Sequence, residues 1–240
     1  MSQVLYEGKS KLVCQGPREG SLLIRYKDTA TAFNGEKKAE LADKGVLNAA
    51  ISNRIFQYLM DHGVETHLIQ VVDDVSVVVR RAEIIPVEVV VRNLAAGGFS
   101  QKYGVPEGTL LRNTVMEFSY KSDALGDPMI NRSQITAIGL ASREELQEME
   151  RQALNINELL CRLFERMDIR LVDFKLEFGR VDGHVILCDE ISPDSCRLWD
   201  MATEEKLDKD RFRRDLGDVL AGYREVLRRL DDVLQTPESE

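Results

Sequence analysis

Short apolar stretches bounded by turn-forming residues fill the first third of the chain. Residues 5–13 and 21–26 have the alternating, β-branched character of strands, and the segment 15–20 between them (QGPREG) is rich in turn formers. Residues 67–72 and 75–80 repeat this arrangement around a pair of aspartates. We therefore predict two β-hairpins in this part of the chain.

Three segments instead carry apolar residues at the three- and four-residue spacing of amphipathic helices. The first is predicted to begin near Asp43 and to end at Gly63. The second begins at Ser142, which forms an S-x-x-E capping box with Glu145, and the third covers 208–234. The apolar positions are Leu47, Ile51, Ile55 and Leu59 in the first, Leu146, Met149, Ala153, Ile156, Leu160, Leu163 and Met167 in the second, and Phe212, Leu216, Leu220, Tyr223, Leu227 and Leu230 in the third.

The remaining strands are predicted from β-branched content. One covers 87–92 and opens at Pro86, and a third hairpin joins 171–179 to 185–190. From 106 to 141 the pattern is irregular and contains a firm breaker, Gly-Asp-Pro, so no element is predicted there.

Hairpins followed by appended helices are typical of an α+β fold rather than of alternating βαβ units. At 240 residues the chain has room for one large domain or two small ones. We predict a smaller N-terminal subdomain, residues 1–80, and a larger C-terminal subdomain, residues 81–240. A cleft is expected between them.

Composition narrows the class of protein. The chain is 43% hydrophobic, and 32 Lys and Arg residues against 41 Asp and Glu residues give a net charge of −9. A strongly acidic chain is a poor non-specific binder of nucleic acid, so a local basic cluster must hold any polyanionic ligand. No run of 18 apolar residues predicts a membrane span, and the amino-terminal MSQVLYEGKSK lacks the apolar core of a signal peptide.

The cysteines and histidines are scattered. Cys14, Cys161, Cys188 and Cys196 show no C-x-x-C spacing, and the three histidines are isolated from one another and from any cysteine pair. Without signs of secretion, we expect reduced thiols in a cytoplasmic protein. A structural zinc site, a Cys–His nucleophile pair, a disulfide scaffold and a fibrous or integral membrane protein are not expected.

Residues 171–179 (LVDFKLEFG) are the most informative stretch. In a strand, Asp173, Lys175 and Glu177 share one face, and the other face is apolar. Three charged groups in a row are open to two interpretations. They form either a solvated outer surface or part of a functional site.

The partner strand favours a site, because its apolar residues lead directly into Asp189 and Glu190. Carboxylates beside a lysine suit Mg²⁺ and nucleotide phosphates, since Mg²⁺ takes one or two carboxylates together with phosphate oxygens. Glu177 and Asp189 can share one Mg²⁺ only if both side chains leave the same face of the hairpin.

The length of the hairpin loop decides that face. A loop of two or four residues places Asp189 on the apolar face, whereas a three-residue loop at 181–183 places it opposite Lys175. Three-residue loops commonly end in a left-handed residue, for which Gly183 is suited. We therefore predict an odd-length loop or a β-bulge between Gly179 and Asp189.

Two lysines lie near the start of the chain. Lys9 and Lys11 are two residues apart and would share a face of the predicted strand, while Gly8 leaves room for a ligand to approach the backbone. The Walker A pattern is absent. Lysines on an edge strand most often face solvent, so a phosphate-binding flap is the alternative that a nearby Mg²⁺ site would favour.

Two arginines are candidate ligand-binding groups. Arg92 closes an otherwise apolar strand, where capping the sheet explains it equally well. Arg197 lies with Asp194 in the loop that follows the acidic hairpin. A guanidinium grips a phosphate or carboxylate at two points, so this pair is suited to orient a ligand.

Several of these stretches resemble the phosphoribosylaminoimidazole-succinocarboxamide synthase (SAICAR synthetase) family, in the family's order and spacing. The resemblance extends from about residue 5 to about residue 234. The matching stretches are YEGKSK at 6–11, PVEVVVRN at 86–93 with AG at 96–97, LVDFKLEFG at 171–179, DEISPDSCRLWD at 189–200 and KDRF at 209–212.

The resemblance implies two subdomains around an ATP cleft and a ligase of de novo purine synthesis. The carboxylate of carboxyaminoimidazole ribotide would be joined to the amino group of L-aspartate through an acyl phosphate, giving SAICAR, ADP and phosphate. Such a reaction needs positioning and charge neutralisation more than a protein nucleophile. It also implies ATP and Mg²⁺ as cofactors, a homodimer, and no nucleic-acid or membrane partner.

The resemblance also implies residue roles. The N-terminal subdomain would bind the nucleotide, and the C-terminal one would carry the metal and substrate sites. The ATP-binding residues are Lys9, Lys11, Lys121 and Lys175; the metal ligands are Glu177 and Asp189; the substrate-binding residues are Arg92, Ser100, Asp194 and Arg197; and the catalytic residues are Lys175 and Asp194.

One position departs from the family. Gly98 stands where the family usually has serine, so a hydroxyl expected to contact the substrate phosphate is missing. Ser100 and backbone N–H groups are the candidates to replace it.

Two other functions fit the same residues. A small-molecule kinase would use the same Mg²⁺ and ATP apparatus but would not need aspartate. A nucleotide sensor would bind ATP without turnover, although binding alone rarely needs two metal-holding carboxylates.

Overall fold

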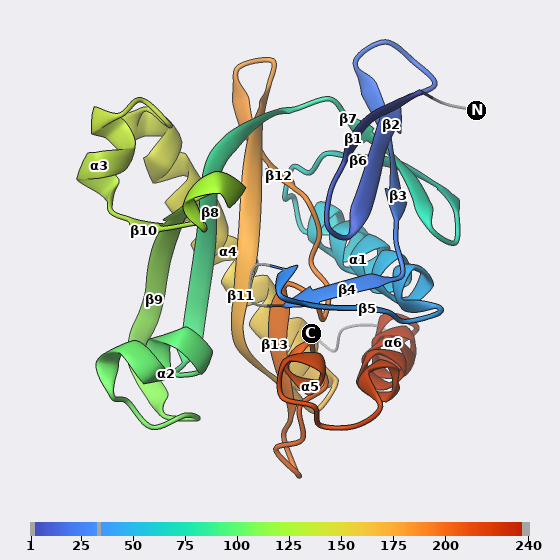
Figure 1. Ribbon diagram of the computed structural model, residues 1–240, viewed down its shortest axis with the longest axis vertical. Helices are drawn as coiled ribbons and strands as arrows, with labels where there is room; N and C mark the ends of the chain where they lie inside the picture. The colour runs from blue at the N-terminus through green and yellow to red at the C-terminus, as the bar shows by residue number, and fades with distance from the viewer. Residues whose placement is uncertain (1–2, 33–34, 237–240) are drawn as a thin grey trace.

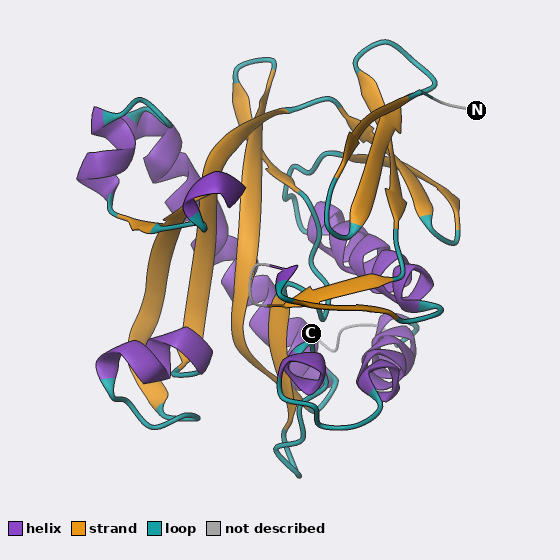
Figure 2. Cartoon of the chain, viewed as in Figure 1, coloured by secondary structure: helices purple, strands orange, loops and turns teal. Residues whose placement is uncertain are grey.

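The computed structural model describes residues 3–32 and 35–236. Two antiparallel sheets lie side by side, with helices packed behind and below them (Figure 1; Figure 2). The predicted α+β class is confirmed. No helix in the described part of the chain is long and apolar enough to cross a membrane.

The N-terminal sheet has five strands in the order β1-β2-β3-β7-β6. A separate two-stranded sheet, β4 with β5, lies below this sheet in the view of Figure 1. The strands are β1 (Val4–Glu7), β2 (Lys11–Gln15), β3 (Ser21–Tyr26), β4 (Thr29–Ala32), β5 (Lys37–Glu40), β6 (Leu68–Asp73) and β7 (Ser76–Arg80).

The larger sheet has six strands, and its central strand β11 pairs with three others. The order is β10-β9-β8-β11-β12, and β13 also pairs with β11. The strands are β8 (Glu83–Leu94), β9 (Leu110–Tyr120), β10 (Met129–Ile130), β11 (Ile169–Val181), β12 (His184–Cys188) and β13 (Cys196–Asp200).

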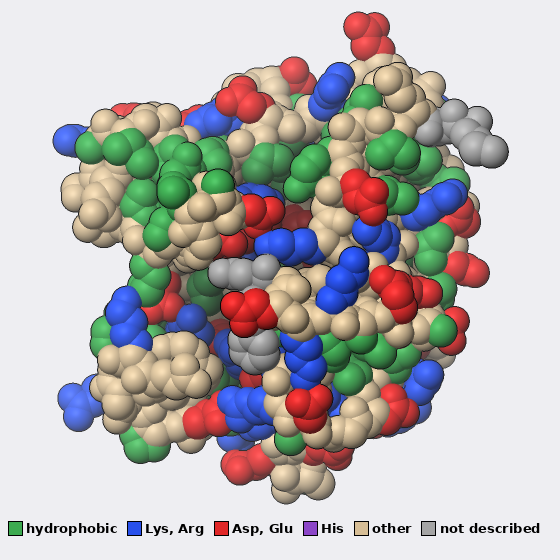
Figure 3. Space-filling view, viewed as in Figure 1, with side chains coloured by type: hydrophobic (Ala, Val, Ile, Leu, Met, Phe, Trp, Pro, Cys, Tyr) green, Lys and Arg blue, Asp and Glu red, His purple; other side chains and the backbone are tan. Residues whose placement is uncertain are grey.

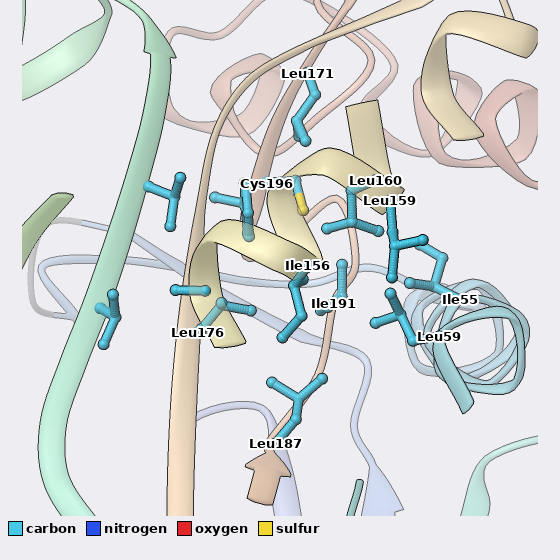
Figure 4. Packing of buried hydrophobic residues seen from close by; sticks show 14 of the residues in the cluster. Ile55, Leu59, Ile156, Leu159, Leu160, Leu171, Leu176, Leu187, Ile191 and Cys196 are labelled. Atoms are coloured by element: carbon cyan, nitrogen blue, oxygen red, sulfur yellow. The ribbon is translucent and has the colours of Figure 1, made fainter. Parts of the chain in front are cut away.

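The long helix α4 covers the apolar side of β11, away from its charged face. Helix α1 packs on α6. Figure 4 shows Ile156 of α4 beside Leu176 of β11 in the core. The helices are α1 (Lys44–Asp61), α2 (Gly97–Tyr103), η2 (Asp123–Leu125, a 3₁₀ turn), α3 (Arg132–Ala137), α4 (Arg143–Arg166), α5 (Asp210–Arg213) and α6 (Val219–Leu234).

Several predicted elements are confirmed. Ser142 caps α4, and its side chain and that of Glu145 form the reciprocal hydrogen bonds of a capping box. The helix that begins after Asp43 and the hairpin of β6 and β7 also lie where the sequence predicts them. The apolar patterns therefore located these elements, although α4 alone among them begins with a capping side chain.

The predicted strand over 5–13 is wrong, because the chain turns back within it. The Gly8 N–H donates to the Lys11 carbonyl at 2.8 Å, and β1 pairs antiparallel with β2. Lys9 therefore lies in the turn and Lys11 on β2, so the two lysines do not share one strand face. Gly8 and Ser10 are the turn-forming residues that the apolar pattern concealed.

The segment 106–141, predicted to lack regular structure, holds β9, β10 and α3. Most side chains of β9 are half-buried or exposed because only β10 covers part of its outer edge, so a clean alternation of apolar and polar residues is missing. The predicted strand over 87–92 is also longer than expected. It begins at Glu83, and Pro86 is tolerated because it lies at a register shift opposite Glu177 and Gly179.

The predicted helix over 208–234 is interrupted. Asp215 and Gly217 have left-handed φ values of 54° and 90°, and Asp218 caps the new helix α6. Phe212 of the short helix α5 packs on Ala30 and Ala32 rather than on the α6 stripe, and Leu216 is exposed. The sequence did not predict this break, because the apolar residues of α5 and α6 follow one continuous four-residue spacing.

Candidate active site

Two adjoining cavities lie between the sheets. Their volumes are about 480 Å³ and about 370 Å³, and Glu88, Lys175, Asp194 and Lys209 line both. Figure 3 shows the hollow in the centre of this face, where Lys and Arg side chains lie beside Asp and Glu side chains. A cleft of this size suits a small-molecule ligand.

Lysines and carboxylates converge at the junction of the two cavities. Lys175 Nζ lies 2.5 Å from Glu177 Oε1, 3.0 Å from Glu88 Oε1 and 3.6 Å from Asp189 Oδ2. Lys121, at the end of β9, forms an ion pair with the other oxygen of Glu177. Glu177 is almost completely buried, so its charge is balanced within the protein rather than by solvent.

Lys11 ties the N-terminal sheet to the same cluster. Its Nζ lies 2.5 Å from Asp189 Oδ1 and 2.8 Å from Glu190 Oε1. Burial disfavours the charged form of Lys11, but Asp189 and Glu190 outweigh burial and raise its pKa. Burial likewise disfavours the Asp189 carboxylate, but Lys11, Lys175 and Lys121 hold its pKa well below the ordinary value.

The hairpin between Gly179 and Asp189 differs from the prediction. Val181 pairs with His184 across a two-residue turn, and the register continues unbroken to Glu177 and Cys188. The predicted odd loop or bulge is therefore wrong.

Asp189 nevertheless reaches Lys175, as the predicted clustering of Lys175, Glu177 and Asp189 requires. It follows Cys188, the last paired residue of β12, and has a left-handed φ of 63°. Face alternation holds only inside the ladder, so this backbone turn redirects the side chain. Aspartate tolerates the left-handed region better than most residues do.

An arginine cluster occupies the other end of the charged face of β11. Arg92 Nη1 donates to Asp173 Oδ2 at 2.5 Å, and Arg197 Nη1 donates to both Asp173 oxygens at 2.9 and 3.1 Å. Gly97 has a φ of 52°, and a Cβ there would lie 2.4 Å from the Arg197 guanidinium. Glycine suits this left-handed φ, and a larger residue would have to displace the Arg197 guanidinium.

Each arginine also has a second acidic partner. Arg92 Nε donates to Glu117 at 2.6 Å, and Arg197 Nε donates to Asp210 at 3.0 Å. Burial disfavours the charged form of Arg197, but Asp173 and Asp210 outweigh it and raise its pKa. Both guanidinium groups are therefore fixed in place before any substrate arrives.

Asp194 lines both cavities, and residues outside the cavities contact its carboxylate. The Tyr223 hydroxyl donates to its Oδ1 at 2.6 Å, and Lys44 Nζ lies 2.6 Å from its Oδ2. Lys209 Nζ is 3.9 Å from the same Oδ2. Burial disfavours the charged form of Asp194, but Lys209 and Lys44 lower its pKa.

Two predicted site residues lie apart from these clusters. Lys9 lines both cavities, but its ammonium pairs with the exposed Asp123 at 2.7 Å across the mouth of the cleft. Ser100, on α2, lines neither cavity, and its buried Oγ has no hydrogen-bond partner among the residues that the structure describes. Its contact with a substrate phosphate stays a prediction.

Sequence reasoning assigned no role to Asp173, Lys44, Tyr223 or Asp210. Asp173 was visible on the charged face of its strand, but only the strand register places it opposite Arg92 and Arg197. Lys44 left one local sign. A lysine in the first turn of a helix opposes the helix dipole, which indicates a compensating charge nearby.

A cleft between two antiparallel sheets, lined by lysine–carboxylate pairs and paired arginines, is typical of an enzyme that uses a nucleotide to act on an anionic substrate. The family model described as SAICAR synthetase matches residues 4–230. The phosphoribosylaminoimidazole-succinocarboxamide synthase of Clostridium perfringens is 50% identical over 228 residues, covering 95% of this chain and 97% of that protein.

Solved structures of SAICAR synthetases are also similar to this chain. The crystal structure of the Ehrlichia chaffeensis phosphoribosylaminoimidazole-succinocarboxamide synthase is 42% identical, with a TM-score of 0.93 over 95% of this chain and 98% of that one. A SAICAR synthetase in complex with ADP is 42% identical, with a TM-score of 0.92 over 98% and 99% of the two chains. The chain belongs to the SAICAR synthetase family. It is an ATP-dependent carbon–nitrogen ligase that forms SAICAR in purine biosynthesis.

Proposed function

We propose that the larger cavity binds ATP, that the smaller one binds carboxyaminoimidazole ribotide with L-aspartate, and that the γ-phosphate lies where they adjoin. The position of Lys175 carries this proposal, because it lines both cavities and contacts Glu177 and Asp189. The larger cavity alone has an apolar part that suits a purine base. This part is lined by Val13, Leu22, Ile24, Val79, Ala82 and Ile84.

Glu177 and Asp189 would hold Mg²⁺. Their carboxylate oxygens converge on one cationic atom, Lys175 Nζ, at 2.5 and 3.6 Å, and carboxylate oxygens are ligands that Mg²⁺ prefers. Within residues 3–32 and 35–236, no three His, Cys, Asp or Glu side chains form a metal-binding group. This supports an ion whose coordination is completed by phosphate oxygens and water rather than by a protein cage. When bound, Mg²⁺ neutralises phosphate charge.

The lysines would contact the phosphates. Lys11, Lys121 and Lys175 already surround the carboxylates that would take up the metal, so each can turn its ammonium to a phosphate oxygen. Lys9 would break its ion pair with Asp123 and contact a phosphate of the nucleotide instead. Lysine suits this role because its ammonium is a point charge on a flexible stem.

The arginine end would hold the ribotide. Arg92 and Arg197 present fixed guanidinium groups to the smaller cavity, which favours a phosphate or carboxylate bound at two points. Asp194 would orient the substrate at the junction, and Ser100 is the proposed substitute for the hydroxyl missing at Gly98. Lys175 and Asp194 are the proposed catalytic residues.

The reaction proceeds in two displacements. An oxygen of the ribotide carboxylate attacks the γ-phosphorus, the bond to the β–γ bridging oxygen breaks, and ADP leaves. The aspartate amine then attacks the acyl carbon, the C–O bond to phosphate breaks, and the amine loses a proton. Lys175 stabilises the charge on the transferred group, because a positioned cation is most effective where charge develops.

The acyl phosphate is tested by labelling the ribotide carboxylate with ¹⁸O. The proposed route transfers one carboxylate oxygen to the inorganic phosphate product, which mass spectrometry detects. Unlabelled phosphate formed together with SAICAR would rule out the acyl phosphate.

Omission of each substrate in turn tests the assignment as a whole. SAICAR formation should require ATP, the ribotide and L-aspartate together. A stable phosphorylated ribotide without aspartate would indicate a kinase, and nucleotide binding without turnover would indicate a sensor.

The same proposal includes a cytoplasmic homodimer with neither nucleic-acid nor membrane partners, and nucleotide-binding and substrate subdomains that divide at residue 80. Light scattering during gel filtration would give twice the chain mass of 27.2 kDa for the dimer. A single chain mass at micromolar concentration would contradict it.

A further inference from the structure

A charged network lies directly behind the cleft, on helices that contribute nothing to its lining. Lys44 is the first residue of α1, and its side chain is only 1% exposed. Tyr223, on α6, is completely buried. Both contact Asp194 at 2.6 Å, one at each carboxylate oxygen.

The position of the Lys44 ammonium is energetically unfavourable for two reasons. A buried ammonium loses its hydration, and a cation in the first turn of a helix opposes the positive end of the helix dipole. The first turn of α1 holds no acidic residue; Asp28 accepts a hydrogen bond from the Gly45 N–H at 2.8 Å, and Asp194 is the carboxylate that pairs with the Lys44 ammonium. An apolar pair would serve stability at least as well, which indicates that the charges serve the cleft.

Asp194 is the only one of these three residues that lines the cavities, and it lines both. We infer that Lys44 and Tyr223 are positioning residues that hold the Asp194 carboxylate charged and in one orientation at the junction of the two cavities. This inference rests on the proposed function insofar as Asp194 orients a substrate. The two contacts themselves do not depend on that role.

Other charged groups near Asp194 come from the segment around α5. Lys209 Nζ, 3.9 Å away, also lines both cavities, and Arg213 and Glu190 act electrostatically on Lys209. Burial lowers the pKa of Lys209, but its charge lowers the pKa of Asp194 at least as much as that of Lys44 does, so both lysines hold the carboxylate charged. Lys44 is closer to the carboxylate, and Tyr223 fixes the other oxygen.

A neighbouring ion pair provides a matched control. Arg54 of α1 pairs with Asp231 of α6, so it joins the same two helices, but it lies on the outer surface and lines neither cavity. Arg54→Met therefore disturbs helix docking without touching Asp194.

The test is the titration of Asp194 in the full-length protein labelled with ¹³C at aspartate carboxyl groups, with Asp194→Asn identifying the signal. In the wild type the signal should not titrate between pH 4 and 8. In Lys44→Met the titration should move to higher pH than in the wild type, because one of the two lysines that lower the Asp194 pKa is gone. Arg54→Met should resemble the wild type.

Activity provides the second readout. Lys44→Met should lower kcat/KM at pH 7.5 by about 10²-fold and move the acidic limb of its pH profile upward. Lys44→Arg should restore part of the loss because it keeps the charge. Tyr223→Phe keeps the buried ring and removes only the hydroxyl. It should lower kcat/KM about 10-fold and move the acidic limb of the pH profile in the same direction as Lys44→Met.

The double variant Lys44→Met/Asp194→Asn separates positioning from folding. It removes both charges of the Lys44–Asp194 pair, although Lys209 also loses this carboxylate, so it should recover part of the melting temperature lost in Lys44→Met without recovering activity. If Lys44→Met fails to fold, Tyr223→Phe gives the decisive titration. An Asp194 signal unchanged in both folded variants, in an enzyme that makes SAICAR, would overturn the inference. A wild type that makes no SAICAR would instead overturn the proposed function and leave the titration result interpretable.

Discussion

The charged face of β11 carries an acidic residue near each end, and the two are held in different ways. Asp173 lies between Arg92 and Arg197, which reach it from the neighbouring strands β8 and β13. Glu177 lies between Lys121 and Lys175. Both residues are 3% exposed, so burial does not distinguish them.

The difference lies in the cations. A guanidinium is planar and forms two-point contacts in a fixed geometry, whereas an ammonium is a compact charge that rotates freely. The arginine end is therefore built before substrate binds, which suits one rigid anionic group. The lysine end consists of contacts that can be exchanged, which suits phosphates and a metal ion that enter and leave with each turnover.

The largest effect is expected at the lysine end. Glu177→Gln removes a proposed metal carboxylate, and the loss of one preorganised electrostatic group costs about 10²–10³ in kcat. Steady-state SAICAR formation with increasing Mg²⁺ measures it. Glu83→Gln, an exposed glutamate outside both cavities, should keep full activity. Near-normal turnover of Glu177→Gln at modest Mg²⁺ would remove Glu177 from the site.

At the arginine end, the effect should fall on substrate binding rather than on turnover. Arg92→Lys or Arg197→Lys loses the two-point contact, worth about 1.5–3 kcal/mol for a charged group, and should raise KM for the ribotide about 10- to 100-fold. KM for ATP, measured in the same assay, should change much less. A defect selective for ATP would show that the two ends have been assigned the wrong way round.

His67 is a buried histidine that lines the larger cavity beside the lysine end. Burial, and then Lys11, lower its pKa to about 4. An unfolded chain takes up this proton near pH 6.5, so folding stability falls as the pH drops from about 6.5 towards 4. Between pH 7.5 and 5, His67→Gln should lose about 2 kcal/mol less stability than the wild type in urea unfolding. Equal losses would contradict a depressed pKa.

The smallest effect is expected at the mouth of the cleft. Asp123→Asn breaks the ion pair with Lys9, whose partners are 45% and 67% exposed, so the cost in stability should stay below about 1 kcal/mol. Because Lys9 is then available to the nucleotide, KM for ATP should stay the same or fall slightly. A severalfold rise in that KM would show that Asp123 itself takes part in binding.

Much of the fold was predictable where one local rule decided the outcome. The cap at Ser142 and the apolar stripe of α4 depend only on neighbouring residues, and the structure confirms both. The strand β9 and the break at Gly217 were missed. In β9 the burial pattern depends on a partner strand, and at Gly217 two helices happen to share one period.

In the candidate site, too, the sequence predicted part of the arrangement and missed what depends on distant parts of the chain. Lys175, Glu177 and Asp189 were expected together, and they lie together, but the predicted loop parity was wrong. The pattern of apolar and polar residues cannot show that Asp189, which follows the last paired residue of β12, has a left-handed backbone. Lys44 and Tyr223 were missed because their contact with Asp194 spans helices far apart in the sequence.

The left-handed backbone at Asp189 also makes the site independent of the far end of its hairpin. The aspartate acquires its direction after the last pair of β12, so the turn at Asp182 and Gly183 sets nothing that the cleft uses. Both turn residues are exposed and line neither of the two cavities. A short peptide inserted at this tip would therefore leave turnover intact.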